Sequence, residues 1–190
     1  MIKFELEEIE GRMIVQLTEA YLSELIALFT RTIAAMQIQG IDQWDELYPN
    51  RELLCQDIAA NSAYAYLVGT EIAGYIVVNE LDSPEYSQVD WLNKDSSFQV
   101  IHRLCVSPNY QNQGIAKKLV SFAEELAFSK GYTSIRLDAF SKNPLSLRLY
   151  EKLNYQRLGE VQFRKGIFIC FEKILSLKDK STATKEMEPQ

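Results

Sequence analysis

An apolar strand leads directly into a polar turn at residues 104–116, and the turn opens a helix. The first N–H groups of a helix have no acceptor within the helix and lie at the positive end of its dipole. A phosphate placed there satisfies both features. Gly114 has no Cβ and lets such a ligand approach the backbone closely. The stretch therefore predicts a phosphate-binding turn between a strand and a helix.

The spacing within this turn differs from that of the two common phosphate-binding loops. Neither G-x-G-x-x-G nor G-x-x-x-x-G-K-[ST] follows the strand. The sequence has Q-x-x-G-x-A instead, formed by Gln111, Gly114 and Ala116. The helix that follows has one apolar stripe, made of Ile115, Leu119, Phe122 and Leu126. Gly131 stands where a helix commonly ends.

A second helix is expected after a short strand at residues 134–139. Asn143 is a good N-cap residue, and Pro144 suits the first helical position. The segment then continues through Tyr150-Glu151-Lys152 to Tyr155.

These two motifs together resemble the signatures of the GNAT acyltransferase superfamily. The turn is similar to its acetyl-CoA pyrophosphate loop, Q/R-x-x-G-x-G/A. The segment from Asn143 to Tyr155 is similar to N-x-x-A-x-x-x-Y-E-K-x-G-F. Ser146 replaces the usual Ala and Asn154 the usual Gly, and Asn tolerates the left-handed conformation expected there. The resemblance covers residues 97–174 well, whereas the N-terminal half matches only in the order of its elements.

The remaining elements follow the same order as in that family. Strands are expected at residues 12–17, 63–68, 72–79, 97–106, 134–139, 156–161 and 167–173, with a helix from Thr18 to Gly40 and another at 51–60. Residues 1–11 are interpreted as an extension and 82–95 as a long polar loop. The resemblance implies an α/β (α+β) fold, a mixed and mostly antiparallel sheet of about seven strands flanked by about four helices on both faces. Its fourth and fifth strands would be parallel and splay apart to admit acyl-CoA.

The length and composition favour a single domain and limit the classes of molecule that the protein is expected to bind. With 190 residues, 47% of them hydrophobic, the chain is long enough for a substantial core. We expect a single domain over residues 1–175 and a mobile polar tail over 176–190. The formal charge of −6 argues against nucleic acid and fits a cationic substrate better than an anionic one. No apolar run suits a membrane span, and no signal peptide is evident.

The cysteines and the histidine constrain the compartment and the chemistry. Cys55, Cys105 and Cys170 are odd in number and far apart, which favours free thiols in a reducing cytosol. We therefore expect a cytoplasmic protein. His102 is the only histidine of the chain, so a metal site built on several histidines is excluded and no metal is expected.

The resemblance implies acetyl-CoA as the acyl donor and assigns residues to it. Backbone N–H groups of the turn would bind the pyrophosphate, at Gln111, Asn112, Gln113, Gly114, Ile115 and Ala116. Leu104 and Val106 would offer backbone groups to the pantetheine arm. Asn143 would cap its helix and also bond the pantetheine. Tyr150 is the expected general acid toward the CoA thiolate, because a phenol has a pKa near 10 and stays protonated at neutral pH.

Three side chains are candidates for the remaining chemistry. His102 is our first candidate for the general base, because it precedes the turn on the central strand and titrates near neutrality. Its alternation places it on one face with Leu104 and Val106, so a buried structural histidine is the alternative. Asp138 is a rival base that would otherwise orient a substrate or stabilise a turn. Cys105 is interpreted as a buried strand cysteine rather than an acyl-carrying nucleophile.

The acceptor side is expected at residues 39–49, where carboxylates mix with the aromatic side chains of Trp44 and Tyr48. Tyr86, Trp91 and Phe163 are further candidates for this wall. An ammonium-bearing molecule suits such a surface, so the expected acceptor is a small amine, an amino acid or a peptide terminus.

We therefore predict an N-acetyltransferase that moves an acetyl group from acetyl-CoA to a primary amine by direct transfer. The alternative is a non-catalytic module on the same fold that senses acyl-CoA or docks to a partner, since a fold alone does not decide function. Neither nucleic acid nor membrane is an expected partner. A homodimer is a reasonable expectation, with the apolar strand 168–171 pairing across chains.

Overall fold

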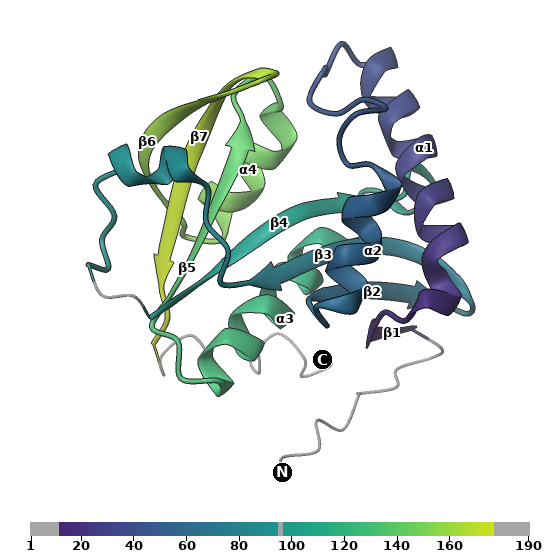
Figure 1. Ribbon diagram of the computed structural model, residues 1–190, viewed down its shortest axis with the longest axis horizontal. Helices are drawn as coiled ribbons and strands as arrows, with labels where there is room; N and C mark the ends of the chain where they lie inside the picture. The colour runs from purple at the N-terminus through teal and green to yellow at the C-terminus, as the bar shows by residue number, and fades with distance from the viewer. Residues whose placement is uncertain (1–11, 95–96, 177–190) are drawn as a thin grey trace, which may run out of the picture.

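The computed structural model describes residues 12–94 and 97–176. One seven-stranded sheet runs through this part of the chain, in the order β1-β2-β3-β4-β5-β7-β6 (Figure 1). The β4–β5 pair is parallel, and the other neighbouring pairs are antiparallel. The strands are β1 Arg12–Gln16, β2 Ala63–Val68, β3 Glu71–Asn79, β4 Phe98–Val106, β5 Ser134–Phe140, β6 Gln156–Phe163 and β7 Gly166–Ile174.

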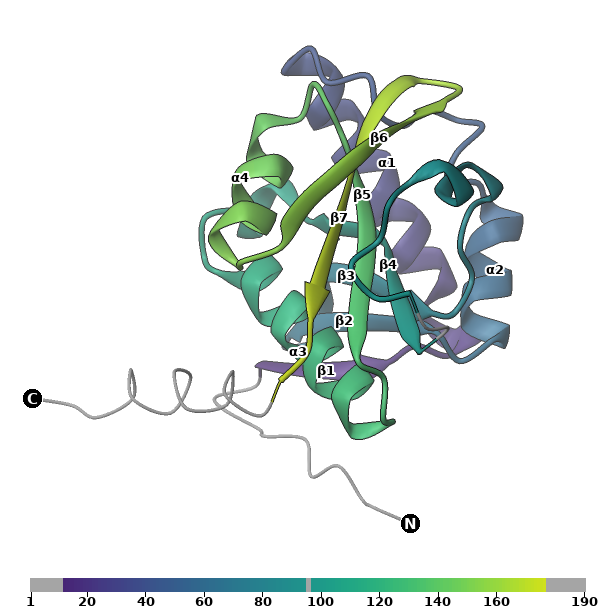
Figure 2. The same cartoon turned by 90° about the vertical axis from the view of Figure 1, so that its left-hand side faces the viewer.

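Four α-helices cover both faces of the sheet (Figures 1 and 2). They are α1 Leu22–Ile38, α2 Arg51–Ala59, α3 Ile115–Ser129 and α4 Pro144–Lys152, with short 3-10 turns η1 Glu19–Tyr21, η2 Pro84–Gln88 and η3 Pro108–Tyr110. The cores on the two faces are separate: α1 and α2 pack on one face, and α3 and α4 on the other. The predicted fold class is therefore confirmed.

Local signals placed most element boundaries correctly. The Asn143 side chain caps α4 by accepting a hydrogen bond from the Ser146 N–H, and Asn154 has the left-handed φ of 64° that its motif position requires. Thr18 is an exception, because it precedes η1, makes no side-chain cap and leaves α1 to begin at Leu22. The predicted extension at 1–11 and the tail from 177 onward lie outside the described residues.

The parallel pair β4–β5 separates partway along its length. Its ladder ends at the pair Ile101–Leu137, and both strands continue beyond this point without each other (Figure 1). The expected splay between the fourth and fifth strands is therefore present. Backbone groups of β4 past Ile101 have no β5 partner, so they are open to a ligand on that side.

A bulge in β4 changes which side chains share a face. Arg103 has a φ of +52°, and the register with β3 shifts between Val77, which is opposite His102, and Tyr75, which is opposite Cys105. His102 therefore lies on the face of α1 and α2, whereas Leu104 packs into the core on the other face. The predicted alternation of His102 with Leu104 and Val106 is wrong, because the bulge interrupts the period of two.

The strand that we expected to pair across chains is not at an edge. β7 lies between β5 and β6 and is hydrogen-bonded to both, so residues 168–171 have no free strand edge. That route to a homodimer is excluded, and the edges of the described sheet are β1 and β6.

Gly74 of β3 allows α3 to approach the sheet closely. A Cβ at this position would lie 2.9 Å from side-chain atoms of both Ile115 and Leu119. Both residues are buried at the start of α3, next to the predicted phosphate turn. The position of the turn over the sheet therefore depends on this glycine.

We expect Gly74→Ala to destabilise the protein by about 1–3 kcal/mol, because the added methyl group overpacks this contact. Chemical denaturation measures the change in the free energy of unfolding. Gly159→Ala is the matched control in β6, where a Cβ would lie 3.5 Å from Val89 in ordinary contact. Its effect should stay within about 0.5 kcal/mol. Equal stability of both variants would contradict the close approach of α3.

Candidate active site

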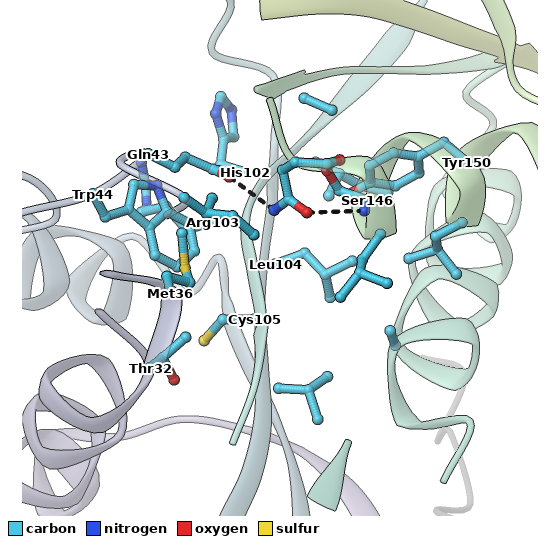
Figure 3. A pocket seen from close by; sticks show the side chains of 18 of the residues that line it. Thr32, Met36, Gln43, Trp44, His102, Arg103, Leu104, Cys105, Ser146 and Tyr150 are labelled. Atoms are coloured by element: carbon cyan, nitrogen blue, oxygen red, sulfur yellow. Dashed lines mark hydrogen bonds between the residues drawn. The ribbon is translucent and has the colours of Figure 1, made fainter. Parts of the chain in front are cut away.

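A cavity of about 650 Å³ occupies the gap between β4 and β5. The turn at 111–116 and α4 line one end of it, and the loop after α1 and the β6–β7 turn line the other. Figure 3 shows Gln43, Trp44 and Met36 on one side of β4 and Ser146 and Tyr150 on the other. The cavity thus connects the regions that the sequence assigned separately to donor and acceptor.

The turn at 111–116 has the backbone shape of an anion site. Asn112 and Gly114 have left-handed φ values of 61° and 76°, and α3 begins directly after Gly114. The Lys118 N–H donates to the Gly114 carbonyl and is among the first to close a turn of α3, so the N–H groups of Ile115 and Ala116 have no acceptor within the helix. Of the six predicted turn residues, five line the cavity, namely Gln111, Asn112, Gly114, Ile115 and Ala116. Gln113 does not, and its side-chain amide lies 3.5 Å from the Asn109 carbonyl.

The splayed part of β4 and the start of α4 form the middle of the cavity. Leu104, Val106, Asn143 and Tyr150 all line it. Asn143 has two contacts, because its Oδ1 accepts from the Ser146 N–H at 3.3 Å and its Nδ2 donates to Gln43 Oε1 at 3.1 Å. The second contact joins α4 to the loop after α1, which the sequence did not predict.

Tyr150 is a buried phenol at the cavity wall. Its ring contacts those of Tyr155 and Phe171, with centroids 5.7 and 5.8 Å away. Burial, and then the nearby carboxylate of Asp138, raises the pKa of Tyr150 above its ordinary value. Among the described residues its hydroxyl has no hydrogen-bond partner, so a proton on Tyr150 is held firmly and is available to a ligand.

Asp138 lines the cavity from the end of β5. Its Oδ2 accepts a hydrogen bond from the Tyr86 hydroxyl at 2.7 Å. Burial raises the pKa of Asp138 to about 6, although the hydrogen bond from Tyr86 lowers it. Strand alternation places Asp138 on the face of Cys170, its partner in the ladder, whereas Tyr150 packs on the opposite face. Asp138 and Tyr150 therefore approach the gap between β4 and β5 from opposite faces of the sheet.

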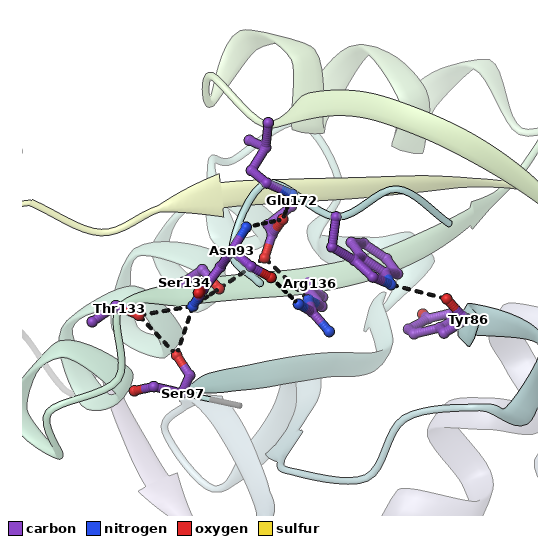
Figure 4. A network of polar contacts seen from close by, with 9 residues as sticks. Tyr86, Asn93, Ser97, Thr133, Ser134, Arg136 and Glu172 are labelled. Atoms are coloured by element: carbon purple, nitrogen blue, oxygen red, sulfur yellow. Dashed lines mark hydrogen bonds and ion pairs between the residues drawn. The ribbon is translucent and has the colours of Figure 1, made fainter. Parts of the chain in front are cut away.

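A network beneath Asp138 fixes the loop that contains Tyr86 (Figure 4). The fully buried Glu172 accepts from the Leu92 and Asn93 N–H groups, from Ser134 Oγ and from Arg136 Nε. The Arg136 guanidinium also lies against the rings of Trp91 and Phe98. The Trp91 indole N–H then donates to the Tyr86 carbonyl at 3.0 Å. Tyr86 and Trp91 are thus core residues that position Asp138, and neither lines the cavity as we had expected.

His102 lines the same cavity in a different environment. Its Nε2 lies 3.0 Å from Asn79 Oδ1. Burial, together with the neighbouring Arg103 charge, lowers the pKa of His102 to about 4. The imidazole is therefore neutral at physiological pH and is a weaker proton acceptor than Asp138.

Arg103, which the sequence analysis did not single out, holds the bulge in place. Its Nε donates to Asp57 Oδ2 at 2.9 Å, its Nη2 pairs with Asp57 Oδ1, and its Nη1 donates to Tyr48 at 3.3 Å. Tyr75 donates a further hydrogen bond to Asp57 at 3.1 Å. The pair joins α2 to the central strand and fixes Tyr48 at the cavity wall.

The acceptor end includes residues that were predicted and residues that were missed. Trp44 and Tyr48 line it, as does Phe163. Arg164 and Lys165 line it as well and pair with Asp45 of the loop after α1. The sequence contains both the basic turn and the acidic loop. Their contact could not be predicted from it, because the two segments are more than a hundred residues apart.

The cysteines have no catalytic environment. Burial raises the pKa of Cys105, which lines the cavity, so the thiol does not ionise at neutral pH. Cys55 and Cys170 are also free thiols. In residues 12–94 and 97–176, no cluster of three or more His, Cys, Asp or Glu side chains has the arrangement of a metal site.

Comparison with known proteins identifies the family. A sequence model of the acetyltransferase (GNAT) family matches residues 23–155. The chain therefore belongs to the GNAT acetyltransferases.

Relatives and solved structures agree with this assignment. N-alpha-acetyltransferase RimI of Mycobacterium tuberculosis (strain ATCC 25618 / H37Rv) is 29% identical over 131 residues, 67% of this chain and 70% of that protein. A GNAT-family acetyltransferase from Streptococcus agalactiae 2603 superimposes with a TM-score of 0.78 at 23% identity, over 90% of this chain and 99% of that chain. The PaiA N-acetyltransferase of Thermoplasma acidophilum, solved with coenzyme A, gives a TM-score of 0.64 at 20% identity, over 86% and 98% of the two chains.

Within residues 12–94 and 97–176, no helix is both long enough and apolar enough to span a membrane.

Proposed function

We propose that this protein transfers an acetyl group from acetyl-CoA directly to a primary amine of a small molecule, an amino acid or a peptide. One observation carries the proposal: a single cavity connects an anion-binding helix start with a phenol and a carboxylate on opposite sides of the splay. Family membership supplies the reaction class, and the name of the mycobacterial relative supports an amine acceptor.

The donor end fits acetyl-CoA on its own geometry. The N–H groups of Ile115 and Ala116 at the start of α3 suit a pyrophosphate, and the open edge of β4 at Leu104 and Val106 suits the amides of a pantetheine arm. Asn143 Nδ2 donates a hydrogen bond to Gln43. The Asn143 side chain therefore orders the cavity wall in addition to contacting the ligand. When bound, acetyl-CoA supplies the activated thioester.

Asp138 and Tyr150 carry out the two proton transfers, with Asp138 as the general base and Tyr150 as the general acid. An alkyl ammonium has a pKa of about 10.4, so the enzyme has to accept a proton before the amine attacks. Asp138 is charged above pH 6 and takes that role in place of our first candidate, His102, whose pKa lies near 4. Tyr150 stays protonated and donates to the departing thiolate.

The donor site is tested by Gly114→Leu. We expect acetyl-CoA affinity to fall at least about tenfold, which is ~1.4 kcal/mol, because a side chain would enter the anion site. Isothermal titration calorimetry measures the dissociation constant. Gly69→Leu is the control, since Gly69 also has a left-handed φ and open space around its Cα but lies outside the cavity. Unchanged affinity in the Gly114 variant would show that the turn does not bind the donor.

The acid is tested by Tyr150→Phe. We expect kcat to fall by about 100-fold while acetyl-CoA affinity changes little, because the proton donor is lost but the ring remains. A thiol-release assay and calorimetry give the two quantities. Tyr155→Phe is the control, because Tyr155 packs on the same ring but does not line the cavity. An unaltered kcat for Tyr150→Phe would remove this residue from the acid role.

The base is tested by the pH dependence of kcat/KM. A carboxyl accepts a proton only in its charged form, so kcat/KM should rise with pH through an apparent pKa near 6. Asp138→Asn should abolish this limb and lower the plateau. His102→Asn should leave the limb in place. A limb near pH 4 that disappears with His102 instead would assign the base to the histidine.

The alternative function is a non-catalytic acyl-CoA sensor on the same fold. Both proteins would bind acetyl-CoA, but only the enzyme releases thiol when pooled amines are added. Binding without release from a broad amine panel would favour the sensor.

A further inference from the structure

The acceptor half of the cavity has an apolar wall. We use the name acceptor half for the part on the α1 side of β4, where Ala35, Met36, Trp44, Phe163 and Phe168 form this wall and polar side chains, among them Gln43 and Tyr48, complete the lining. Figure 3 shows Met36 and Trp44 side by side there, on the side of β4 away from Tyr150. Thr32 adds a buried hydroxyl without a hydrogen-bond partner. A ligand body placed here exchanges water for hydrocarbon and aromatic surface.

The cations around this half already have anionic partners. Arg103 is paired with Asp57, and Arg164 forms two hydrogen bonds to Asp45, at 2.7 and 2.8 Å. Lys165 lies 2.6 Å from Asp42 and 2.8 Å from Asp45. A substrate carboxylate would therefore have to compete with a protein carboxylate for each of these groups.

Asp138 is the one carboxylate among the described residues that line the cavity. It is enough to receive one ammonium group and then to accept its proton. A second ammonium on the same molecule, as in a polyamine, would have to enter apolar surface without a counter-charge, which is unfavourable. The charges thus favour a single amine on an uncharged body.

Polar contacts also tie the two sides of the acceptor half together. The loop after α1 reaches the β6–β7 turn through Asp45 and Asp42, and it reaches α4 through the Gln43–Asn143 hydrogen bond. We call these contacts the bridge. Figure 1 places the loop and the turn at the same end of the molecule. A peptide in an extended conformation needs an open groove there, which the bridge closes. A small amine fits as a whole molecule in the space under the bridge.

We infer that the acceptor is a small primary monoamine with an apolar, uncharged body, such as an aralkylamine, and that it binds whole beneath the Asp45–Arg164–Lys165 bridge. This inference rests on the proposed acetyl transfer and names its substrate class. Its amine faces Asp138, and its apolar body packs against Met36, Trp44 and Phe168.

Three related amines test the inference directly. Phenethylamine, phenylalanine and the dipeptide Phe-Ala share one ring and differ in the group next to the amine. We expect kcat/KM for phenethylamine to exceed the other two by about tenfold or more, a difference of ~1.4 kcal/mol. Intrinsic reactivity favours the dipeptide, whose α-amino pKa of about 7.7–8.0 leaves more neutral amine. A preference for phenethylamine would therefore come from the site.

Variants locate the binding surface. Ala35→Phe should fill the acceptor half and raise the KM for phenethylamine about tenfold, while acetyl-CoA affinity stays unchanged. Ala34→Phe is the matched control, because Ala34 is the neighbouring, exposed residue of α1 and does not line the cavity. Asp45→Asn releases Arg164 and should increase the relative kcat/KM for phenylalanine.

The outcomes separate this inference from the proposed function. Transfer that is fastest to Phe-Ala or phenylalanine would overturn the monoamine class while leaving an N-acetyltransferase. Equal effects of Ala35→Phe and Ala34→Phe would show that the amine binds elsewhere. Failure to release thiol with any amine, including putrescine and spermidine, would instead contradict the proposed function.

Discussion

The buried ion pair between Asp57 and Arg103 maintains the geometry on which the cavity depends. Arg103 is a non-glycine residue with a φ of +52°, a conformation that costs about 1–3 kcal/mol. The side chains of Arg103 and Asp57 are only 8% and 5% exposed. Relaxing the bulge would withdraw the guanidinium and leave the Asp57 carboxylate buried without its cation, a loss of about 3–5 kcal/mol that exceeds the strain. The bulge is therefore the more stable arrangement.

The bulge has two consequences for the site. It shifts the alternation after Arg103, so His102 and Cys105 both face α1 and α2 while Leu104 lies against α3. It also lies just beyond Ile101, where the ladder with β5 ends, so the strands separate at the same level as the catalytic candidates. Asp138 and Tyr150 then approach from opposite faces of the sheet, and a ligand between them contacts both.

The sequence predicted features whose signals are local. The turn at Gly114, the Asn143 cap and the left-handed Asn154 depend on nearby residues, and each is present. The bulge could not be predicted in this way, because the Asp57 side chain that pairs with Arg103 lies 46 residues before it. A strict period of two therefore placed His102 on the same face as Leu104 and Val106, which is wrong. The bridge from Asp45 to Arg164 spans 119 residues and was missed for the same reason.

The number of donors around each buried carboxylate explains which one remains available for chemistry. Glu172 accepts four hydrogen bonds, and Asp57 accepts from Tyr75 and from two nitrogens of Arg103, so the oxygens of both carboxylates are occupied within the fold. Asp138 accepts a single hydrogen bond among the described residues, from the Tyr86 hydroxyl at 2.7 Å, and it lines the cavity. Burial raises the pKa of Asp138 to about 6, and the hydrogen bond from Tyr86 only partly opposes this rise. The network around Glu172 fixes the loop that holds Tyr86. The single hydrogen bond from Tyr86 therefore orients the Asp138 carboxylate, while its raised pKa still allows it to accept a proton.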